Sequence, residues 1–343
     1  TPRIDYTDGG CPVLLTEPQS TNLITNSNNF NSTSWLKEGG STVESNTASS
    51  PDGSINASYV KAPVGTGITP RVAYTFSSVA GESYIGSIFI KKDNVDWIRL
   101  LSTGAAATTV QAYYDISNGS LGTSSSPSIS TIEDYGNGWY RLGLEIVAVN
   151  TGAATFRIQM AGSDGGSIIT TDGTEKFLVY GGQLEELSYA TSYIPTYGAV
   201  RTRLQDNVRR AGTVTDFNSA EGTLFWEGSF LSNGRIEINS ADNLYRVIIG
   251  FSTSVFYRIR ENGVNLFTNF FVSANEYNRN YKIAVRYKSG NSCIYVNGVK
   301  ESDLNAYSLI GLSEVNFVSE GQELLGKTSQ VQVFKTALSD HEL

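Results

Sequence analysis

Four short segments in the first half of the chain alternate apolar residues with residues that could bind a sugar. Successive residues of a β-strand point to opposite faces, so each segment divides into an apolar face and an outward face. The outward residues are Trp97, Arg99, Gln111, Tyr113, Trp139, Arg141, Arg157 and Gln159. Aromatic rings stack on the C–H face of a sugar, and planar polar groups pair with its hydroxyls. We therefore expect a carbohydrate-binding face that includes Trp97, Arg99, Tyr113, Trp139, Arg141 and Gln159.

The same outward residues allow two other interpretations. Trp, Tyr and Arg are also enriched where protein subunits meet, so the face could be a subunit interface. Trp can also cover the edge of a sandwich core while Arg is solvated, which would make this an ordinary surface. The residue pattern leaves these alternatives open.

The chain offers few groups for nucleophilic or acid–base catalysis. Its single histidine, His341, lies in a terminal segment, 338–343, that we predict to be helical. A Ser–His or Cys–His relay needs the histidine within hydrogen-bond reach of the nucleophile. The adjacent acids at 133–134 and 185–186 would face opposite sides of a strand, which does not form the carboxylate pair of a glycosidase. We predict a non-catalytic protein, with a polysaccharide lyase or hydrolase as an alternative.

Asp-Gly loops are the main candidates for an ion site. Asp52, Asp164 and Asp172 each precede a glycine, and Ca²⁺ takes carboxylate and carbonyl oxygens from such loops. The simpler interpretation is that Asp-Gly makes a turn. No cofactor is required, and a structural Ca²⁺ at Asp164 and Asp172 is the metal hypothesis.

The two cysteines and the basic residues add little chemistry. Cys11 and Cys293 belong to no Cys-x-x-Cys pair, and we expect two isolated buried thiols, with a disulfide as the alternative. The net charge of −8 argues against a nucleic-acid partner. One basic cluster interrupts this balance: Arg201, Arg203, Arg209 and Arg210, with Asp206 among them. We interpret it as a solvated connector, with an anion site as the lesser alternative. No segment has the roughly 20 apolar residues that would insert in a membrane.

The elements that position these residues are short strands. Period-two alternation and many Asn-Gly and Asp-Gly turns predict an all-β protein, and 343 residues suit two domains. We expect two β-sandwich (jelly-roll) domains in series. The predicted boundaries are an extended arm at 1–22, a jelly roll at 23–190, a linker at 191–212 and a second sandwich at 213–343. The first residue is Thr1, and the last segment ends within a helix pattern, so we expect a fragment truncated at its C-terminus.

Three groups of motifs resemble a known family. The first is LLTEPQSTNL at 14–23 with Asn26, Ser27, Phe30 and Trp35. The second is GGQLE at 181–185 with TSYIPT at 191–196. The third is KIAVRYKSG at 282–290, YVNG at 295–298 and VFKTALSD at 333–340. Together they are similar to bacteriophage virion proteins of the head- or tail-fibre class.

That resemblance implies a carbohydrate-binding-module-like jelly roll followed by a concanavalin A-like (laminin G-type) sandwich. It further implies a homo-oligomer, commonly a trimer, on the virion surface, which contacts host or environmental glycans and other virion proteins. A purely structural spacer is the alternative role. The chain departs from the family in lacking a visible N-terminal attachment domain, which leaves its position on the particle open.

Overall fold

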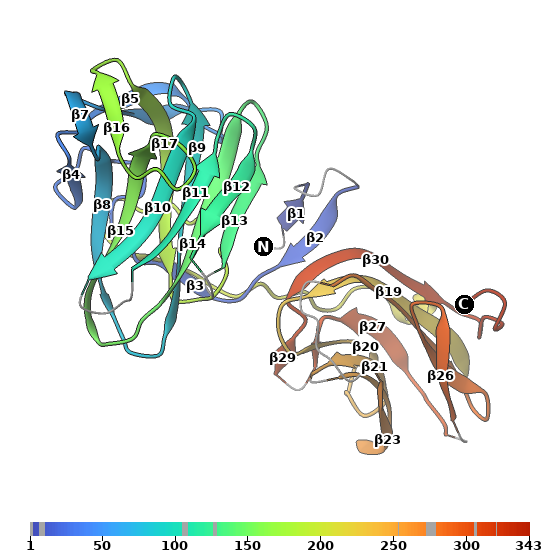
Figure 1. The fold of residues 1–343 in the computed structure, drawn as a ribbon. Coiled ribbons are helices and arrows are strands. Elements are labelled where there is room, and N and C mark those ends of the chain that lie inside the picture. Colours follow the sequence, from blue (N-terminus) through green and yellow to red (C-terminus); the bar gives the residue numbers. More distant parts are fainter. Residues whose placement is uncertain are drawn as a thin grey trace. The chain divides into compact units, whose positions relative to one another are not determined.

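The protein folds into two compact units made almost wholly of antiparallel strands, which confirms the all-β prediction (Figure 1). The computed structural model describes residues 3–6, 11–104, 109–125, 129–252, 254–271, 279–304, 307–319 and 321–343. One unit is Gln19–Leu204, called the first sandwich below. The other joins Thr1–Pro18 to Gln205–Leu343 and is called the second sandwich.

The first sandwich is built from two six-stranded sheets. The β10 sheet contains, in spatial order, β12 (Ser120–Ser124), β11 (Val110–Asp115), β10 (Trp97–Gly104), β15 (Gly152–Ala161), β8 (Arg71–Ser78) and β4 (Trp35–Glu38). The β9 sheet contains β13 (Ser130–Asp134), β14 (Trp139–Val147), β9 (Ser83–Lys92), β17 (Lys176–Glu185), β6 (Ile55–Lys61) and β5 (Thr42–Ser49). Two smaller pairs are β7 (Val64–Ile68) with β16 (Ile169–Asp172), and β3 (Ser20–Asn22) with β18 (Arg201–Arg203).

The core of the first sandwich comes from the alternation seen in the sequence. Ile98 and Leu100 of β10 and Leu142 and Leu144 of β14 are fully buried in one cluster. Each of these residues has a polar or aromatic neighbour that points away from the core, because strand side chains alternate. The predicted apolar faces are therefore the inner faces of the two sheets.

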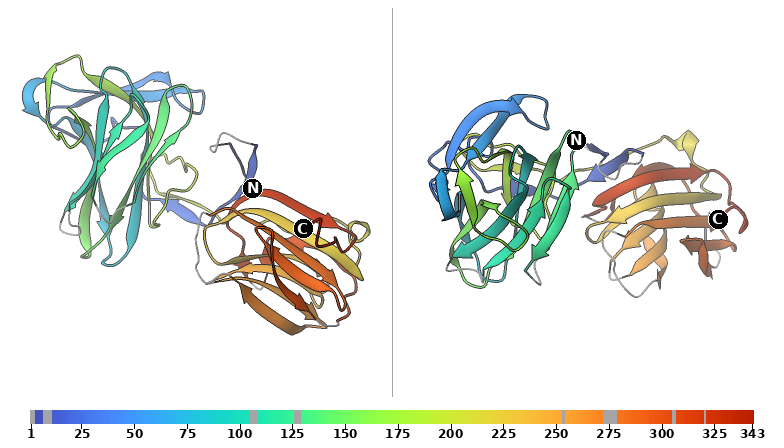
Figure 2. Two further views of the ribbon diagram at one scale, coloured as in Figure 1. Left: turned by 45° about the vertical axis from the view of Figure 1, so that its right-hand side comes forward. Right: turned by 45° about the horizontal axis from the view of Figure 1, so that its top comes forward.

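The second sandwich pairs a seven-stranded sheet with a five-stranded one (Figure 2). The β19 sheet contains β1 (Arg3–Asp5), β2 (Val13–Thr16), β30 (Gly326–Phe334), β19 (Glu221–Phe230), β24 (Tyr281–Lys288), β25 (Ser292–Val296) and β26 (Val299–Leu304). The β20 sheet contains β23 (Val264–Phe271), β22 (Val255–Glu261), β21 (Arg246–Phe251), β20 (Gly234–Ser240) and β27 (Leu312–Asn316). The remaining elements are the pair β28 (Val318–Ser319) and β29 (Gln322–Glu323), and the 3₁₀ turn η1 (Val214–Asp216).

These units divide the chain differently from the predicted boundaries. The segment 1–22 does not form a separate arm, because β2 pairs with β30 through Leu14↔Thr328 and its neighbours and so completes the second sandwich. The segment 191–212 is not a free linker either. Its first part belongs to the first sandwich, where β18 pairs with β3 and Ile194 is buried, and its last part belongs to the second. The chain therefore passes between the units twice, at 18–19 and at 204–205.

Two smaller predictions also change. Segment 338–343 makes a hydrogen-bonded turn in place of a helix, although Ser339 and Glu342 do form the expected capping contact, with Ser339 N donating to Glu342 Oε2 at 2.8 Å. Cys11 and Cys293 are free thiols, and Cys11 is exposed whereas Cys293 is buried. Among the described residues, no helix is long and apolar enough to cross a membrane.

Candidate functional site

The outer face of the β10 sheet brings together most of the residues predicted to bind sugar. Antiparallel pairing places Arg99 of β10 directly between Tyr113 of β11 and Gln159 of β15. The next outward position of β10 is Leu101, which lies between Gln111 and Arg157 in the same way. Trp97 is at the start of β10, at the same face. Residues from three separate strands thus meet on one surface.

Arg99 is held against an aromatic ring and an amide. Its Nη2 donates to Gln111 Oε1, and its guanidinium carbon lies 5.6 Å from the centre of the Tyr113 ring. Tyr113 is only 3% exposed, so its ring supports Arg99 from below and is not itself a platform for a ligand. Arg99 and Gln111 are half-buried and remain reachable from solvent.

The Glu38 carboxylate of β4 holds two arginines, Arg71 of β8 and Arg157 of β15. Glu38 of β4 accepts hydrogen bonds from Arg71 Nε and, at 3.2 Å, from Arg157 Nε. Burial would raise the pKa of Glu38, but the hydrogen bonds from Arg71 and Arg157 outweigh it and hold the pKa below its usual value. Glu38 is therefore an ionised anchor for two guanidinium groups.

Gln159 is a buried connector and not a reachable ligand for sugar. It is fully buried, accepts a hydrogen bond from Arg71 Nη1 at 3.2 Å and donates to the carbonyl of Ser167. The segment that carries Ser167 follows β15 and covers this part of the sheet. Gln159 thus fixes both the covering segment and Arg71.

Trp97 lies beside the same covering segment. Gly122 of β12 makes room for it, because a Cβ at Gly122 would be 2.7 Å from the Trp97 ring and 2.5 Å from Asp164 Oδ1. Asp164 in turn accepts hydrogen bonds from Thr123 N at 2.7 Å and Thr123 Oγ1 at 3.1 Å. Trp97 remains half-buried.

The reachable part of this face is called the arginine strip below. Its members are half-buried side chains of five consecutive strands of the β10 sheet, from β11 to β4: Trp97, Arg99, Gln111, Arg157, Arg71 and Glu38. Arg157 also donates to Thr103 Oγ1. The strip combines one aromatic ring with three fixed guanidinium groups and one amide, a set suited to hydroxyl-rich or anionic ligands.

Trp139 and Arg141 lie elsewhere, so the expectation of a single face for all the outward residues was wrong. Both belong to β14 of the β9 sheet. Trp139 is 3% exposed and packs with Phe89, Leu178 and Tyr180 in a second, smaller core. Arg141 is 4% exposed, donates to Ser87 Oγ at 3.0 Å and stacks 5.3 Å from the Phe89 ring centre. Strand alternation separates inside from outside but does not say which of two sheets a strand joins.

The aspartates of the calcium hypothesis accept hydrogen bonds from protein groups. Asp164 is engaged by Thr123 as described above, and Asp172 accepts hydrogen bonds from Thr174 N at 3.0 Å and Thr174 Oγ1 at 2.6 Å. Asp52 likewise accepts from Ser54 N at 2.8 Å and from Tyr180 at 2.7 Å. Within the part of the chain that the structure describes, no three His, Cys, Asp or Glu side chains gather as a metal site. Asp52 and Asp172 accept from groups of their own turns, whereas Asp164 accepts from Thr123 of β12. Ca²⁺ binding stays an untested prediction.

The first two motif groups form a buried polar joint at one end of the first sandwich. Asn22 Nδ2 donates to the carbonyls of Gly182 (3.1 Å) and Ile194 (2.9 Å), while its Oδ1 accepts from Ile24 N and Leu184 N. Glu185, fully buried, accepts from Ser20 Oγ at 2.6 Å and from Thr191 N at 3.0 Å. These side chains serve the fold, and the acid at 185 has no open side for catalysis. We call this network the motif joint.

The sequence interpretation missed one polar pocket, which lies in the second sandwich. It has a volume of about 220 Å³ and is lined by Arg209, Arg210, Glu237, Asn243, Arg246, Glu314, Asn316, Val318 and Gly321. The only sequence signal was the pair Arg209 and Arg210, in the basic cluster interpreted as a connector. Their partners lie in the β20–β21 hairpin and on β27, β28 and the turn after β28. No local pattern joins these residues to positions 209–210.

Comparisons with known proteins give a likeness of fold. No family model matches the chain, and no curated protein matches it. A heptameric SAP-like pentraxin from Limulus polyphemus is 14% identical, with a TM-score of 0.34 over 40% of this chain and 72% of that one. A Bacteroides ovatus protein, whose carbohydrate-binding role is itself a proposal, is 13% identical, with a TM-score of 0.30 over 81% and 79%. Domains LG4-5 of the mouse laminin α1 chain are 11% identical, with a TM-score of 0.28 over 77% and 88%. At these TM-scores the likeness carries no argument about function.

Proposed function

We propose that the protein binds carbohydrate, and that the first sandwich does so through the arginine strip. The observation that carries the proposal is the meeting of Trp97, Arg99 and Arg157 on one half-exposed face. Their neighbours hold them in place: Tyr113 and Gln111 hold Arg99, and Glu38 holds Arg157.

This arrangement suits an extended glycan better than a small buried ligand. A surface that spans several strands offers repeated contacts along a chain of sugars, with one ring for stacking and several guanidinium groups for hydroxyls or acidic substituents. Because the guanidinium groups are already fixed by the protein, little side-chain entropy is lost on binding.

The finer role follows from the family resemblance. We propose a non-catalytic fibre or decoration protein of a bacteriophage, located on the virion surface, that attaches to host or environmental glycans. In this role the chain would form a homo-oligomer, with a trimer as the expected state, and would contact other virion proteins. Multivalency would then raise a weak affinity per sandwich to a useful one.

A glycan-array screen of the full chain, followed by variants, tests the proposal. We expect Trp97→Ala and Arg99→Ala each to lower glycan affinity about tenfold or more without a change in melting temperature. The matched controls are Tyr197→Ala, an aromatic that is 78% exposed, and Arg201→Ala, an exposed arginine of the same sandwich. If the strip variants bind like the parent, the proposed face is wrong.

Two further outcomes favour the alternative roles. A change in oligomer mass with Trp97→Ala, measured by light scattering, would favour a structural spacer whose strip is a subunit contact. Release of reducing ends or unsaturated uronates from a polysaccharide panel would favour a hydrolase or lyase.

A further inference from the structure

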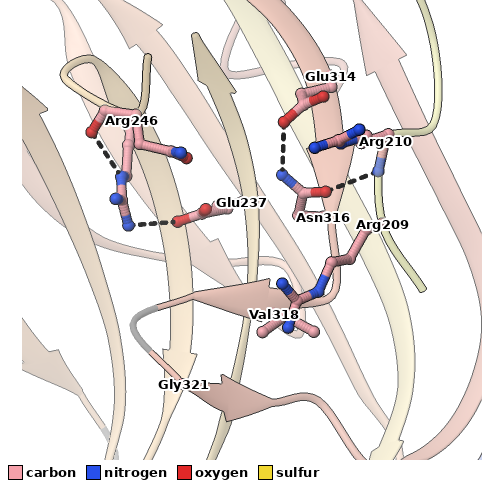
Figure 3. Close-up of a pocket in the computed structure, with 9 residues that line it drawn as sticks. Arg209, Arg210, Glu237, Arg246, Glu314, Asn316, Val318 and Gly321 are labelled. Atoms are coloured by element: carbon pink, nitrogen blue, oxygen red, sulfur yellow. Dashed lines mark hydrogen bonds and ion pairs between the residues drawn. The ribbon is translucent and has the colours of Figure 1, made fainter. Parts of the chain in front are cut away.

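The pocket of the second sandwich lies on the outer face of the β20 sheet (Figure 3). Glu237 of β20 is 1% exposed and lies 3.5 Å from Arg246 Nη1 of β21, measured to its Oε2. Arg246 Nε also donates to the Asn243 carbonyl at 2.9 Å. The floor of the pocket is therefore an ion pair anchored to a turn.

The second wall is a network of amides around Glu314. Asn239 Nδ2 and Asn316 Nδ2 each donate to Glu314 Oε1 at 3.1 Å, and Asn316 Nδ2 also donates to Asn239 Oδ1 at 2.6 Å. Asn239 is fully buried and Asn316 is 6% exposed. Buried polar networks of this kind fix side chains in one geometry.

The third wall is the segment that brings in Arg209 and Arg210. This segment pairs with β27, because Ala211 N donates to Val315 O at 3.0 Å and Val315 N donates to Ala211 O at 2.8 Å. Arg210 N donates to Asn316 Oδ1 at 2.7 Å, and Arg210 has a φ of 61°. A left-handed conformation is unusual for arginine and is found where surrounding structure imposes it. The segment is thus fixed in place, whereas both arginine side chains are exposed.

The charges of the lining residues indicate which kind of ligand the pocket would bind. The two carboxylates are engaged by protein groups, Glu237 by Arg246 and Glu314 by two asparagine amides. Arg209 and Arg210 stand at the entrance, and the Arg209 side chain is 50% exposed, with Glu323 3.7 Å away. Guanidinium groups bind carboxylates through paired hydrogen bonds. An anionic ligand with further hydroxyl groups matches both the entrance and the amide-lined interior.

The size of the pocket limits the ligand. Sites for drug-sized ligands measure about 300–1,000 Å³, and this pocket is smaller, at about 220 Å³. A single sugar ring fits a pocket of this size. We propose that this pocket binds a single acidic sugar residue, whose carboxylate is held by Arg209 and Arg210 and whose hydroxyls contact Asn243, Glu314 and Asn316. This site is separate from the arginine strip and does not depend on it.

Glucuronate and glucose are a matched pair of probes, because they differ in the carboxylate that the proposal requires. A ligand-observed NMR titration of the full chain should give a Kd on the order of 1 mM for glucuronate. Glucose should bind at least tenfold more weakly. Inorganic phosphate tests whether any small anion suffices, and it should also bind at least tenfold more weakly than glucuronate.

Variants assign the binding to the pocket. Arg209→Gln and Arg210→Gln remove the charge and nearly keep the length, and each should weaken glucuronate binding about tenfold to a hundredfold. Arg201→Gln is the control, an exposed arginine of the first sandwich. A melting temperature equal to that of the parent establishes that the variants are folded.

Three results would overturn the proposal. One is glucuronate binding in the Arg209→Gln/Arg210→Gln double variant equal to that of the parent. Another is equal affinity for glucose and glucuronate. The third is phosphate binding as tight as glucuronate binding, which would make the pocket an anion site without sugar selectivity. Trp97→Ala should leave glucuronate binding intact, so failure of the arginine strip and failure of this pocket are distinguishable.

Discussion

Glu38 is a single residue that holds two arginines of the arginine strip in place. Its side chain is 25% exposed, and the partners Arg71 and Arg157 are 26% and 17% exposed. At this degree of burial, water screens a charged hydrogen bond only partly. Each ion pair of Glu38 therefore contributes more to stability than a surface ion pair and less than a fully buried one. The carboxylate stabilises the packing of β4 beside β8. It also fixes the orientation of two guanidinium groups.

We predict that Glu38→Gln lowers the free energy of unfolding of the first sandwich by about 1 kcal/mol at pH 7. The pKa of Glu38 is lowered in the folded protein, so its stabilisation is present above the unfolded pKa of about 4.3 and is lost as the pH falls through the folded pKa. The difference between parent and variant should therefore shrink as the pH falls below the unfolded pKa and vanish once the pH is below the folded pKa. Urea unfolding followed by tryptophan fluorescence measures this, because Trp35, Trp97 and Trp139 are in the first sandwich.

A matched acid provides the control for Glu38. Glu44 pairs with Lys61, but its side chain is 53% exposed, so Glu44→Gln should leave unfolding unchanged. If Glu38→Gln behaves like Glu44→Gln at pH 7, or if its effect does not shrink as the pH is lowered, Glu38 does not act as an ionised anchor.

At the scale of elements, the motif joint ties β3 to β17 and to the segment after it. Asn22 is fully buried and satisfies two carbonyls and two N–H groups from Gly182, Leu184, Ile24 and Ile194. We predict that Asn22→Ala destabilises the first sandwich by about 3 kcal/mol or more, because each buried group left without a partner costs about 1–3 kcal/mol. Asn31→Ala, at an exposed position, should be neutral. A neutral Asn22→Ala in thermal unfolding would show that the joint does not hold the strands.

Close packing between the sheets depends on Gly86 of β9. A Cβ at this position would lie 2.5 Å from the ring of Phe156, which is fully buried on β15. We predict that Gly86→Ala costs about 1–3 kcal/mol by overpacking. The double variant Gly86→Ala/Phe156→Leu should recover part of that loss, because the smaller side chain makes room for the methyl group. Denaturant unfolding of Gly86→Ala, Phe156→Leu and the double variant measures the coupling energy between the two positions. Additive changes in the free energy of unfolding would contradict a direct clash.

Whether an element could be predicted depends on how far apart in the sequence the residues that define it lie. Alternation in β10, β14 and β15 correctly separated inward from outward residues, because that pattern is local. It did not reveal that β14 joins the β9 sheet, so Trp139 and Trp97 were placed together although they lie in different sheets. The burial of Gln159 could not be predicted either, because it depends on Ser167 and its neighbours, which fold back over the sheet. The pocket around Glu237 is formed by three stretches of the chain that lie far apart in the sequence. Only the adjacent Arg209 and Arg210 were noticed in the sequence.

At the scale of the whole molecule, the N-terminal residues belong to the sandwich at the other end of the chain. Leu14, Leu15 and Thr16 pair with Thr328, Lys327 and Gly326 of β30. Thr16 Oγ1 donates to the Leu324 carbonyl at 2.8 Å. Arg3 pairs with Asp206, with 2.7 Å between Nη2 and Oδ2. The first sandwich is thus inserted between two parts of the second.

This connectivity makes a prediction about removal of residues 1–16. Strand β30 would lose its β2 neighbour and become an edge with unpaired backbone groups, whereas every strand of the first sandwich would keep its partners. Hydrogen exchange by mass spectrometry should show faster exchange in peptides from β30 and β19, with the peptides from β10 and β17 unchanged as an internal control. The opposite pattern, or no change in β30, would mean that the N-terminal strands are dispensable to the second sandwich. The arginine strip lies wholly within Gln19–Leu204, so the deletion should leave glycan binding by the strip unchanged.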